Sequence, residues 1–73
     1  LSISKEFIGI ITGSIDQLPP KCKLIFKLVK EDGLKYREVA ELLDISVKTV
    51  ETQMTIALRR LSEVLEHIKS QQS

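Results

Sequence analysis

The stretch AELLDISVKTV, residues 40–50, constrains the fold of this chain more than any other feature. Apolar residues at helical spacing stand on both sides of a short break, in which Asp44 and Ile45 turn the chain and Ser46 opens a new helix. Serine is a good N-cap, and aspartate is among the residues that tolerate a positive φ. The stretch therefore predicts a sharp corner between two helices.

The rest of the chain also reads as helical. Leu, Ile, Glu and Lys dominate, glycine and proline number only three and two, and there are no valine- or threonine-rich alternating runs. We expect helices over about residues 4–17, 20–31 and 35–43, and a fourth that begins after Ser46 and reaches Lys69. The 73 residues thus predict one all-α, four-helix domain with a small core.

Each predicted helix carries an apolar face. Gly33 is a plausible residue for ending the second helix, and Ile56 falls off the apolar stripe of the fourth helix and is expected to be exposed. The residues expected to face inward are Phe7, Ile11, Ile15 and Leu18, widened by Ile3, Ile8 and Ile10; Cys22, Ile25, Phe26 and Val29; Val39, Ala40 and Leu43 with Leu42 beside them; and Val47, Val50, Met54, Ala57, Leu58, Leu61, Val64, Leu65 and Ile68.

The corner meets the requirements of a helix-turn-helix. Such a motif needs a small residue where the helices cross, a turn residue that tolerates positive φ, an apolar plug and an N-cap. Ala40, Asp44, Ile45 and Ser46 supply these in order. The second helix of the motif enters the major groove of DNA. Many helical bundles contain similar corners, so the pattern alone favours DNA binding without establishing it.

Ten polar or charged residues are the candidates for contact with DNA. Lysine can bind guanine acceptors or phosphate, threonine can touch thymine methyls or phosphates, glutamate can accept from cytosine, and glutamine can pair with adenine. Arg37, near the N-terminus of one predicted helix, can bind phosphate, and so can Arg59 and Arg60 farther along the next helix. The alternative is a helix cap at Ser46 and a solvated face elsewhere. The candidates are Arg37, Ser46, Lys48, Thr49, Glu51, Thr52, Gln53, Thr55, Arg59 and Arg60.

Residues 18–61 resemble region four, the C-terminal promoter-binding domain of bacterial sigma factors, and among them the extracytoplasmic-function group. The resemblance lies in the opening Leu18 and Pro19, the REVAELL core, the DIS turn and the KTV entry into the second helix. It implies a four-helix unit whose last helix reads the minus-35 promoter element. The implied partners are double-stranded promoter DNA, RNA polymerase core through the flap of its β subunit, and an anti-sigma regulator, all in the cytoplasm.

The sequence departs from the family pattern in its charge. The family usually has glycine where Asp44 stands, often has glycine where Lys48 stands, and commonly carries several basic residues after the threonine-valine pair. Here residues 46–60 contain three basic residues and one acidic residue, and the whole chain has a formal charge of only +1. Because phosphate neutralisation supplies most non-specific affinity, we expect the isolated domain to bind DNA weakly.

Two other functions stay open. The ISVKTVE stretch also suits the DNA-binding domain of response regulators and quorum-type activators, although the opening LPPK favours sigma. A sigma-like domain could also bind proteins without reading DNA. The Lys23, Lys27 and Lys30 face suits either DNA or an acidic partner, or is simply solvated, and a homo-oligomer is possible but not implied.

Other classes of protein find no support in the sequence. No catalytic triad, carboxylate pair or phosphate-binding glycine loop is visible, so we expect neither an enzyme nor a cofactor. Cys22 is the single cysteine and reads as a core residue, and His67 has no second metal ligand nearby. No apolar run approaches the ~18 residues of a membrane helix. Because the chain starts at Leu1 within an apolar pattern, we expect it to be part of a longer protein.

Overall fold

The computed structural model describes residues 4–72, and every regular element in that range is an α-helix. The helices are α1 (Lys5–Asp16), α2 (Pro20–Lys30), α3 (Tyr36–Leu43) and α4 (Val47–Gln72). The prediction of an all-α fold with four helices is confirmed. The fourth helix was expected to end near Lys69 and instead continues to Gln72, since no glycine or proline interrupts it.

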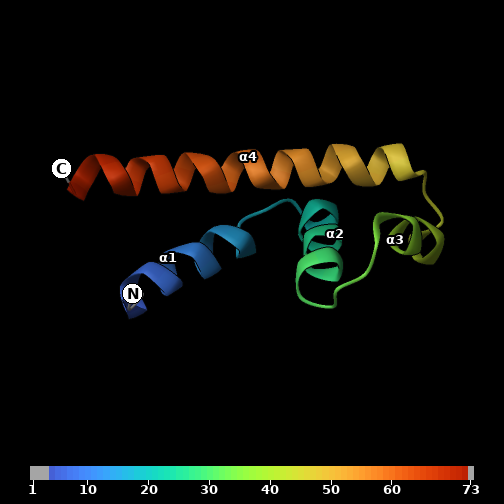
Figure 1. The fold of residues 1–73 in the computed structure, drawn as a ribbon, viewed down its shortest axis with the longest axis horizontal. Coiled ribbons are helices and arrows are strands. Elements are labelled where there is room, and N and C mark those ends of the chain that lie inside the picture. Colours follow the sequence, from blue (N-terminus) through green and yellow to red (C-terminus); the bar gives the residue numbers. More distant parts are fainter. Residues whose placement is uncertain (1–3, 73) are drawn as a thin grey trace.

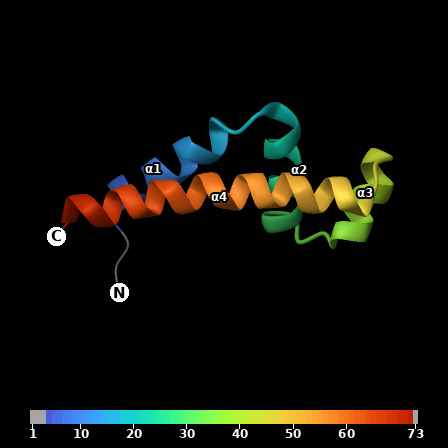
Figure 2. The same cartoon turned by 90° about the horizontal axis from the view of Figure 1, so that it is seen from above.

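The long helix α4 sets the shape of the molecule. Its 26 residues span about 39 Å, which accounts for most of the 43 Å long dimension of the protein. The helices α1, α2 and α3 follow one another along α4, and each packs against it (Figure 1). In the view from above, α2 crosses α4 while α1 runs beside its C-terminal half (Figure 2).

The buried core lies at the helix-turn-helix end of the molecule. Ile25 and Val39 are fully buried there, against the equally buried Val50 of α4. The helix α1 contributes no buried residue. Among the described residues, the core cluster consists of Leu18, Cys22, Ile25, Phe26, Val39, Ala40, Val50, Met54 and Ala57.

The apolar faces of α2 and α3 are largely as predicted, but that of α1 is narrower. Ile8 is 53% exposed and Ile10 is 47% exposed, so the expectation that they widen the buried stripe was wrong. The cause is the placement of α1, which packs mainly on α4, so that much of its surface stays in solvent. Ile3, which was expected to join the same stripe, lies outside the described residues.

Further burial predictions were wrong on α3 and α4. Leu42 was expected beside the inward face of α3 but is 63% exposed, because α4 covers only the side that carries Val39 and Ala40. Ile56 was expected to be exposed but is partly buried and packs against the core cluster. On α4, Val47, Leu58 and Leu65 were also expected to face inward and are exposed, because they lie along one edge of its apolar stripe.

Local signals explain where the helices begin and end. The Ser4 hydroxyl oxygen accepts a hydrogen bond from the Phe7 N–H at 3.2 Å and caps α1, and Pro20 occupies the first turn of α2. Gly33 has a φ of 71°, as its expected role after α2 requires. It lies two residues beyond the C-cap, Glu31. The N–H of the following residue, Leu34, donates to the Leu28 carbonyl at 3.1 Å.

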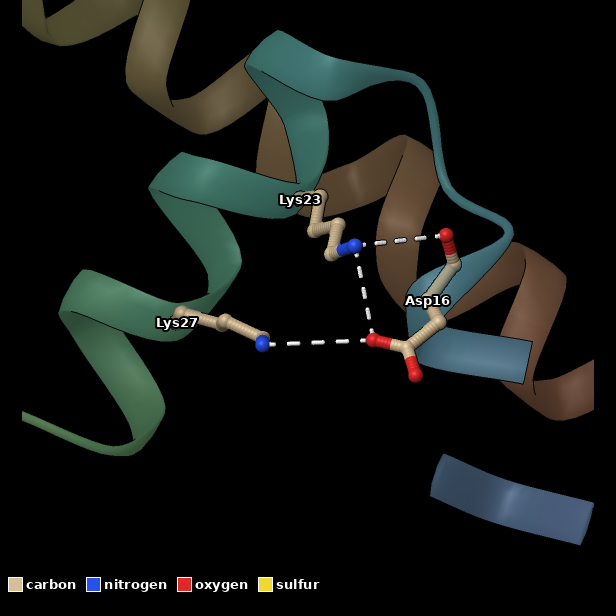
Figure 3. Close-up of polar contacts among 3 residues, drawn as sticks. All are labelled: Asp16, Lys23 and Lys27. Carbon is tan, nitrogen blue, oxygen red and sulfur yellow. Dashed lines mark hydrogen bonds and ion pairs between the residues drawn. The ribbon is translucent and has the colours of Figure 1, made fainter. Parts of the chain in front are cut away.

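An ion-pair cluster fastens the end of α1 to α2. The Asp16 carboxylate lies 3.4 Å from the Lys23 ammonium and 3.9 Å from that of Lys27, and Lys23 also donates to the Asp16 carbonyl at 3.5 Å (Figure 3). These side chains are more than a third exposed, so each pair contributes only about 0.2–1 kcal/mol. Two of the three lysines on the predicted basic face thus have a partner within the chain.

Candidate nucleic-acid interface

The predicted corner between α3 and α4 is present. Asp44 has a φ of 56° and a ψ of 49°, in the left-handed region where Cβ is usually unfavourable. The Ile45 N–H donates to the Ala40 carbonyl at 2.9 Å, and the Thr49 N–H donates to the Ser46 hydroxyl oxygen at 3.1 Å. Ala40 is buried where the helices meet, and Ile45 packs against the core cluster. The geometry is that of a helix-turn-helix.

Four of the ten candidate residues form one exposed stripe on the N-terminal half of α4, called here the reading stripe. Its members are Lys48, Thr52, Thr55 and Arg59. At about 100° per residue they fall within roughly 60° of one another. The buried residues of the same helix, Val50, Met54 and Ala57, lie on the opposite side. The first turns of α4 therefore present a continuous polar and basic surface away from the core.

The other candidates lie beside this stripe or on other elements. Thr49 and Gln53 are half-buried and share one flank of α4 with the exposed Arg60. Glu51 is exposed on the opposite flank. Arg37 is exposed in the first turn of α3, and Ser46 is exposed at the corner. Gln53 is thus less available than an exposed reading residue would be.

Side-chain hydrogen bonds divide the hydroxyl groups of this surface into two kinds. The Thr52 hydroxyl donates to the Lys48 carbonyl at 3.0 Å, and the Thr55 hydroxyl donates to the Glu51 carbonyl at 2.9 Å. The hydroxyls of Ser46 and Thr49 instead lie 2.9 Å from each other. Sequence reasoning missed these bonds, although threonine within a helix is known to bond the carbonyl one turn earlier.

A sulfur hydrogen bond joins the core to the same helix. The Cys22 thiol donates to the Gln53 carbonyl at 3.3 Å, across 31 residues of chain. Burial raises the pKa of the Cys22 thiol above its ordinary value, and the positive charge of Arg60 acts in the opposite direction. The prediction that Cys22 is a core residue is confirmed, since its side chain is only 1% exposed.

The exposed charges of α4 change beyond the reading stripe. Arg59 and Arg60 are followed by the exposed Glu63 and Glu66, which continue the same side of the helix. Carboxylates repel phosphates, so the surface suited to DNA ends at about the fourth turn of α4.

The described part of the chain was also expected to lack metal sites and membrane spans. Residues 4–72 contain no group of three or more His, Cys, Asp and Glu side chains placed to hold a metal ion. None of the helices described is both long and apolar enough to cross a lipid bilayer.

The sequence matches the family model for sigma-70, region 4, over residues 8–61. The chain belongs to the sigma-70 region 4 family. This is a family of promoter-binding transcription domains that work with RNA polymerase, and it is not a catalytic family. The match also selects sigma over the response-regulator class that the ISVKTVE stretch left open.

Comparisons with curated proteins and with solved structures found no significant match. The family match begins within α1 and ends at Leu61. It therefore includes the corner and the reading stripe, and leaves out the last three turns of α4, where the acidic residues stand.

Proposed function

We propose that this sigma region 4 domain binds the minus-35 element of promoters, as in the extracytoplasmic-function group, by laying the reading stripe of α4 in the major groove. The observation that carries this proposal is the position of the stripe. It occupies the first turns of the helix that follows the corner, directly opposite the core. That is the part of a helix-turn-helix that reaches base edges.

The remaining candidates fit supporting roles. Lys48 would bind guanine acceptors or phosphate, and Glu51 on its flank would accept from a cytosine amino group. Arg37 stands in the first turn of α3, where unpaired N–H groups also favour phosphate. Arg59 and Arg60 would hold the DNA backbone at the far end of the contact, and Thr49 and Gln53 would contribute at its edge.

RNA polymerase would supply the affinity that the domain lacks. Within residues 46–60 only three side chains are basic, so few phosphates can be neutralised. We propose that residues 1–73 form one domain held on the promoter through the β-subunit flap, in the bacterial cytoplasm, and open to control by an anti-sigma regulator. The exposed apolar side chains Ile8, Ile10, Leu58 and Leu65 are candidates for these protein contacts.

The proposal is tested by selection from a random duplex library at low salt, about 50 mM, where phosphate contacts are strongest. The enriched duplex is then titrated by fluorescence anisotropy with wild type, Lys48→Ala and Arg59→Ala. Lys69→Ala is the matched control, because it removes the same charge from the same helix beyond the stripe. We expect one enriched motif and weaker binding for the two stripe variants only.

The salt dependence of the same titration gives a second check. Four candidate cations, Arg37, Lys48, Arg59 and Arg60, can neutralise at most about four phosphates. Each phosphate contributes about −0.9 to the slope of log K against log salt, so the slope should be about −4 or shallower. A much steeper slope would mean that another basic surface, such as that of α2, also lies on the DNA.

The second candidate function is a protein-interaction module that does not read DNA. It is favoured by the exposed apolar residues of α1 and α4, which take no part in the core and are free to contact another protein. Ile56 cannot test it, because that side chain packs against the core cluster. The test is Leu58→Ser beside the double variant Lys48→Ala, Arg59→Ala. If only Leu58→Ser abolishes promoter-dependent transcription with polymerase core, this second function is the right one.

A further inference from the structure

We propose that Thr52 and Thr55 read DNA through their methyl groups, and so select thymine at two neighbouring positions of the bound element. This inference rests on the proposed function, in which the reading stripe lies in the major groove. It assigns to these two residues a specificity role that differs from hydrogen bonding to bases or phosphates.

The basis is the direction of the two hydroxyl groups. The Thr52 Oγ1–H donates to the Lys48 carbonyl at 3.0 Å, and the Thr55 Oγ1–H donates to the Glu51 carbonyl at 2.9 Å. Both side chains are exposed on the stripe. A threonine has one hydroxyl hydrogen, so neither residue has a donor left for an outside partner.

This loss of donors excludes most polar contacts. Phosphate oxygens, guanine N7 and O6, adenine N7 and thymine O4 are all acceptors, and each needs a donor from the protein. What Thr52 and Thr55 still offer outward is a methyl group and an oxygen that can only accept. The apolar feature of the major groove that a methyl group contacts best is the C5-methyl of thymine, which no other DNA base carries.

The spacing of the two residues fits adjacent base pairs. Residues three apart on a helix lie on the same side, with Cβ atoms about 5–6 Å apart and a rise of about 4.5 Å along the axis. Base pairs rise by about 3.4 Å. Two methyl groups at this spacing can therefore meet thymines of neighbouring base pairs when the helix lies across the groove.

The hydroxyl pair at the corner has a different capacity. Ser46 and Thr49 share one hydrogen bond between their hydroxyls, so one of their two hydroxyl hydrogens remains available. The Ser46 oxygen also accepts the Thr49 N–H and is exposed beside the first turn of α4. We therefore assign the phosphate contact to the corner and the thymine contact to Thr52 and Thr55.

The experiment uses the duplex enriched in the selection, with each thymine replaced in turn by deoxyuridine, which lacks only the C5-methyl. The proteins are wild type, Thr52→Ser and Thr55→Ser, which lose the methyl, and Thr52→Val and Thr55→Val, which lose the hydroxyl. Valine and threonine are both β-branched, so the variants are matched in shape, and helical circular dichroism verifies their folding.

For wild type we expect two positions at which deoxyuridine weakens binding about fourfold, the effect of one buried methyl group. Each serine variant should weaken binding to the thymine duplex and become insensitive to deoxyuridine at one of these positions. Each valine variant should keep the wild-type sensitivity to deoxyuridine.

Three results would overturn the inference. Specific binding that ignores deoxyuridine at every position would reject methyl reading while leaving promoter binding intact. Loss of binding in the valine variants but not in the serine variants would assign the contact to the hydroxyls. An absence of any enriched motif would reject the proposed function, and this inference with it.

Discussion

The two ends of this molecule are built differently. At the helix-turn-helix end, α2, α3 and the first half of α4 enclose the core cluster, in which Ile25, Val39 and Val50 are fully buried. At the other end, α1 lies along the second half of α4 and contributes no buried residue. Both ends are built from helices and have ample apolar residues, so composition does not explain the contrast.

The number of packing partners explains it. A buried side chain needs neighbours on several sides, and α2 and α3 pack both on α4 and on each other. The helix α1 packs mainly on α4, which covers one side of it. The reading stripe therefore lies at the end that holds the core cluster. We expect local opening to concentrate in α1 and the last turns of α4.

The largest expected effect separates the two ends by core truncation. Ile25→Ala should lower the free energy of unfolding by about 2–5 kcal/mol, because it leaves a cavity in the core cluster. Phe7→Ala, in the half-buried stripe of α1, should lower it by less than half as much although it removes more atoms. Urea denaturation measures both. Equal losses would mean that α1 is as firmly packed as α2.

The corner gives the next effect. Asp44→Val should lower the free energy of unfolding by about 1–2 kcal/mol, since a β-branched residue is strained at a φ of 56°. Asp44→Gly removes the Cβ, relieves that strain and is the matched control. Thermal unfolding of both variants compares them. If valine and glycine were equally stable, the left-handed turn would not persist in solution.

The helix cap of α4 gives a smaller effect. Ser46→Ala removes the acceptor for the Thr49 N–H and should lower the free energy of unfolding by about 1 kcal/mol. Ser4→Ala makes the same change at the cap of α1 and should matter less, because α1 is only loosely held. Urea denaturation of the two variants measures both effects. A larger loss of unfolding free energy from Ser4→Ala would contradict this expectation.

The junction between the two ends gives the smallest effect. Asp16→Asn breaks the ion pairs to Lys23 and Lys27 and should lower the free energy of unfolding by about 1 kcal/mol or less at low salt. The difference from wild type should vanish near 1 M NaCl, where charges are screened within about 3 Å. Hydrogen exchange should show faster opening of α1 and no change in α3. Faster exchange in α3 would show that the ion-pair cluster supports the whole fold.

Sequence alone predicted the corner well because its signals are local. The positive φ of Asp44, the cap at Ser46 and the turn at Gly33 follow from the preferences of single residues, and the structure bears them out. The inner faces of α2 and α3 also followed from periodicity.

The errors arose where a neighbouring helix decides the outcome. Periodicity shows which residues share a face, but not how much of that face a neighbour covers. Leu42 and Ile8 were therefore expected inside and lie outside, while Ile56 was expected outside and is partly buried. The pairing of Asp16 with α2 depends on how the chain turns between α1 and α2, at residues 17–19, which no local pattern encodes.

The ten candidate residues were predicted from their side-chain chemistry, and the structure shows which of them lie together on one surface. Four residues align as the reading stripe, while Thr49 and Gln53 sit half-buried at its edge. The direction of the Thr52 and Thr55 hydroxyls depends on the side-chain rotamer. Threonine in a helix adopts two rotamers, so the sequence alone does not predict which one is present.

The most direct test of the central claim is a nuclear magnetic resonance titration of the protein with the selected duplex, following backbone amide shifts. If the reading stripe lies in the major groove, the shifts should concentrate in residues 46–60 and the first turn of α3, and residues 62–72 should stay unchanged. Shifts confined to α1 and residues 62–72, with residues 46–60 unmoved, would contradict the account and place the working surface at the other end of the molecule.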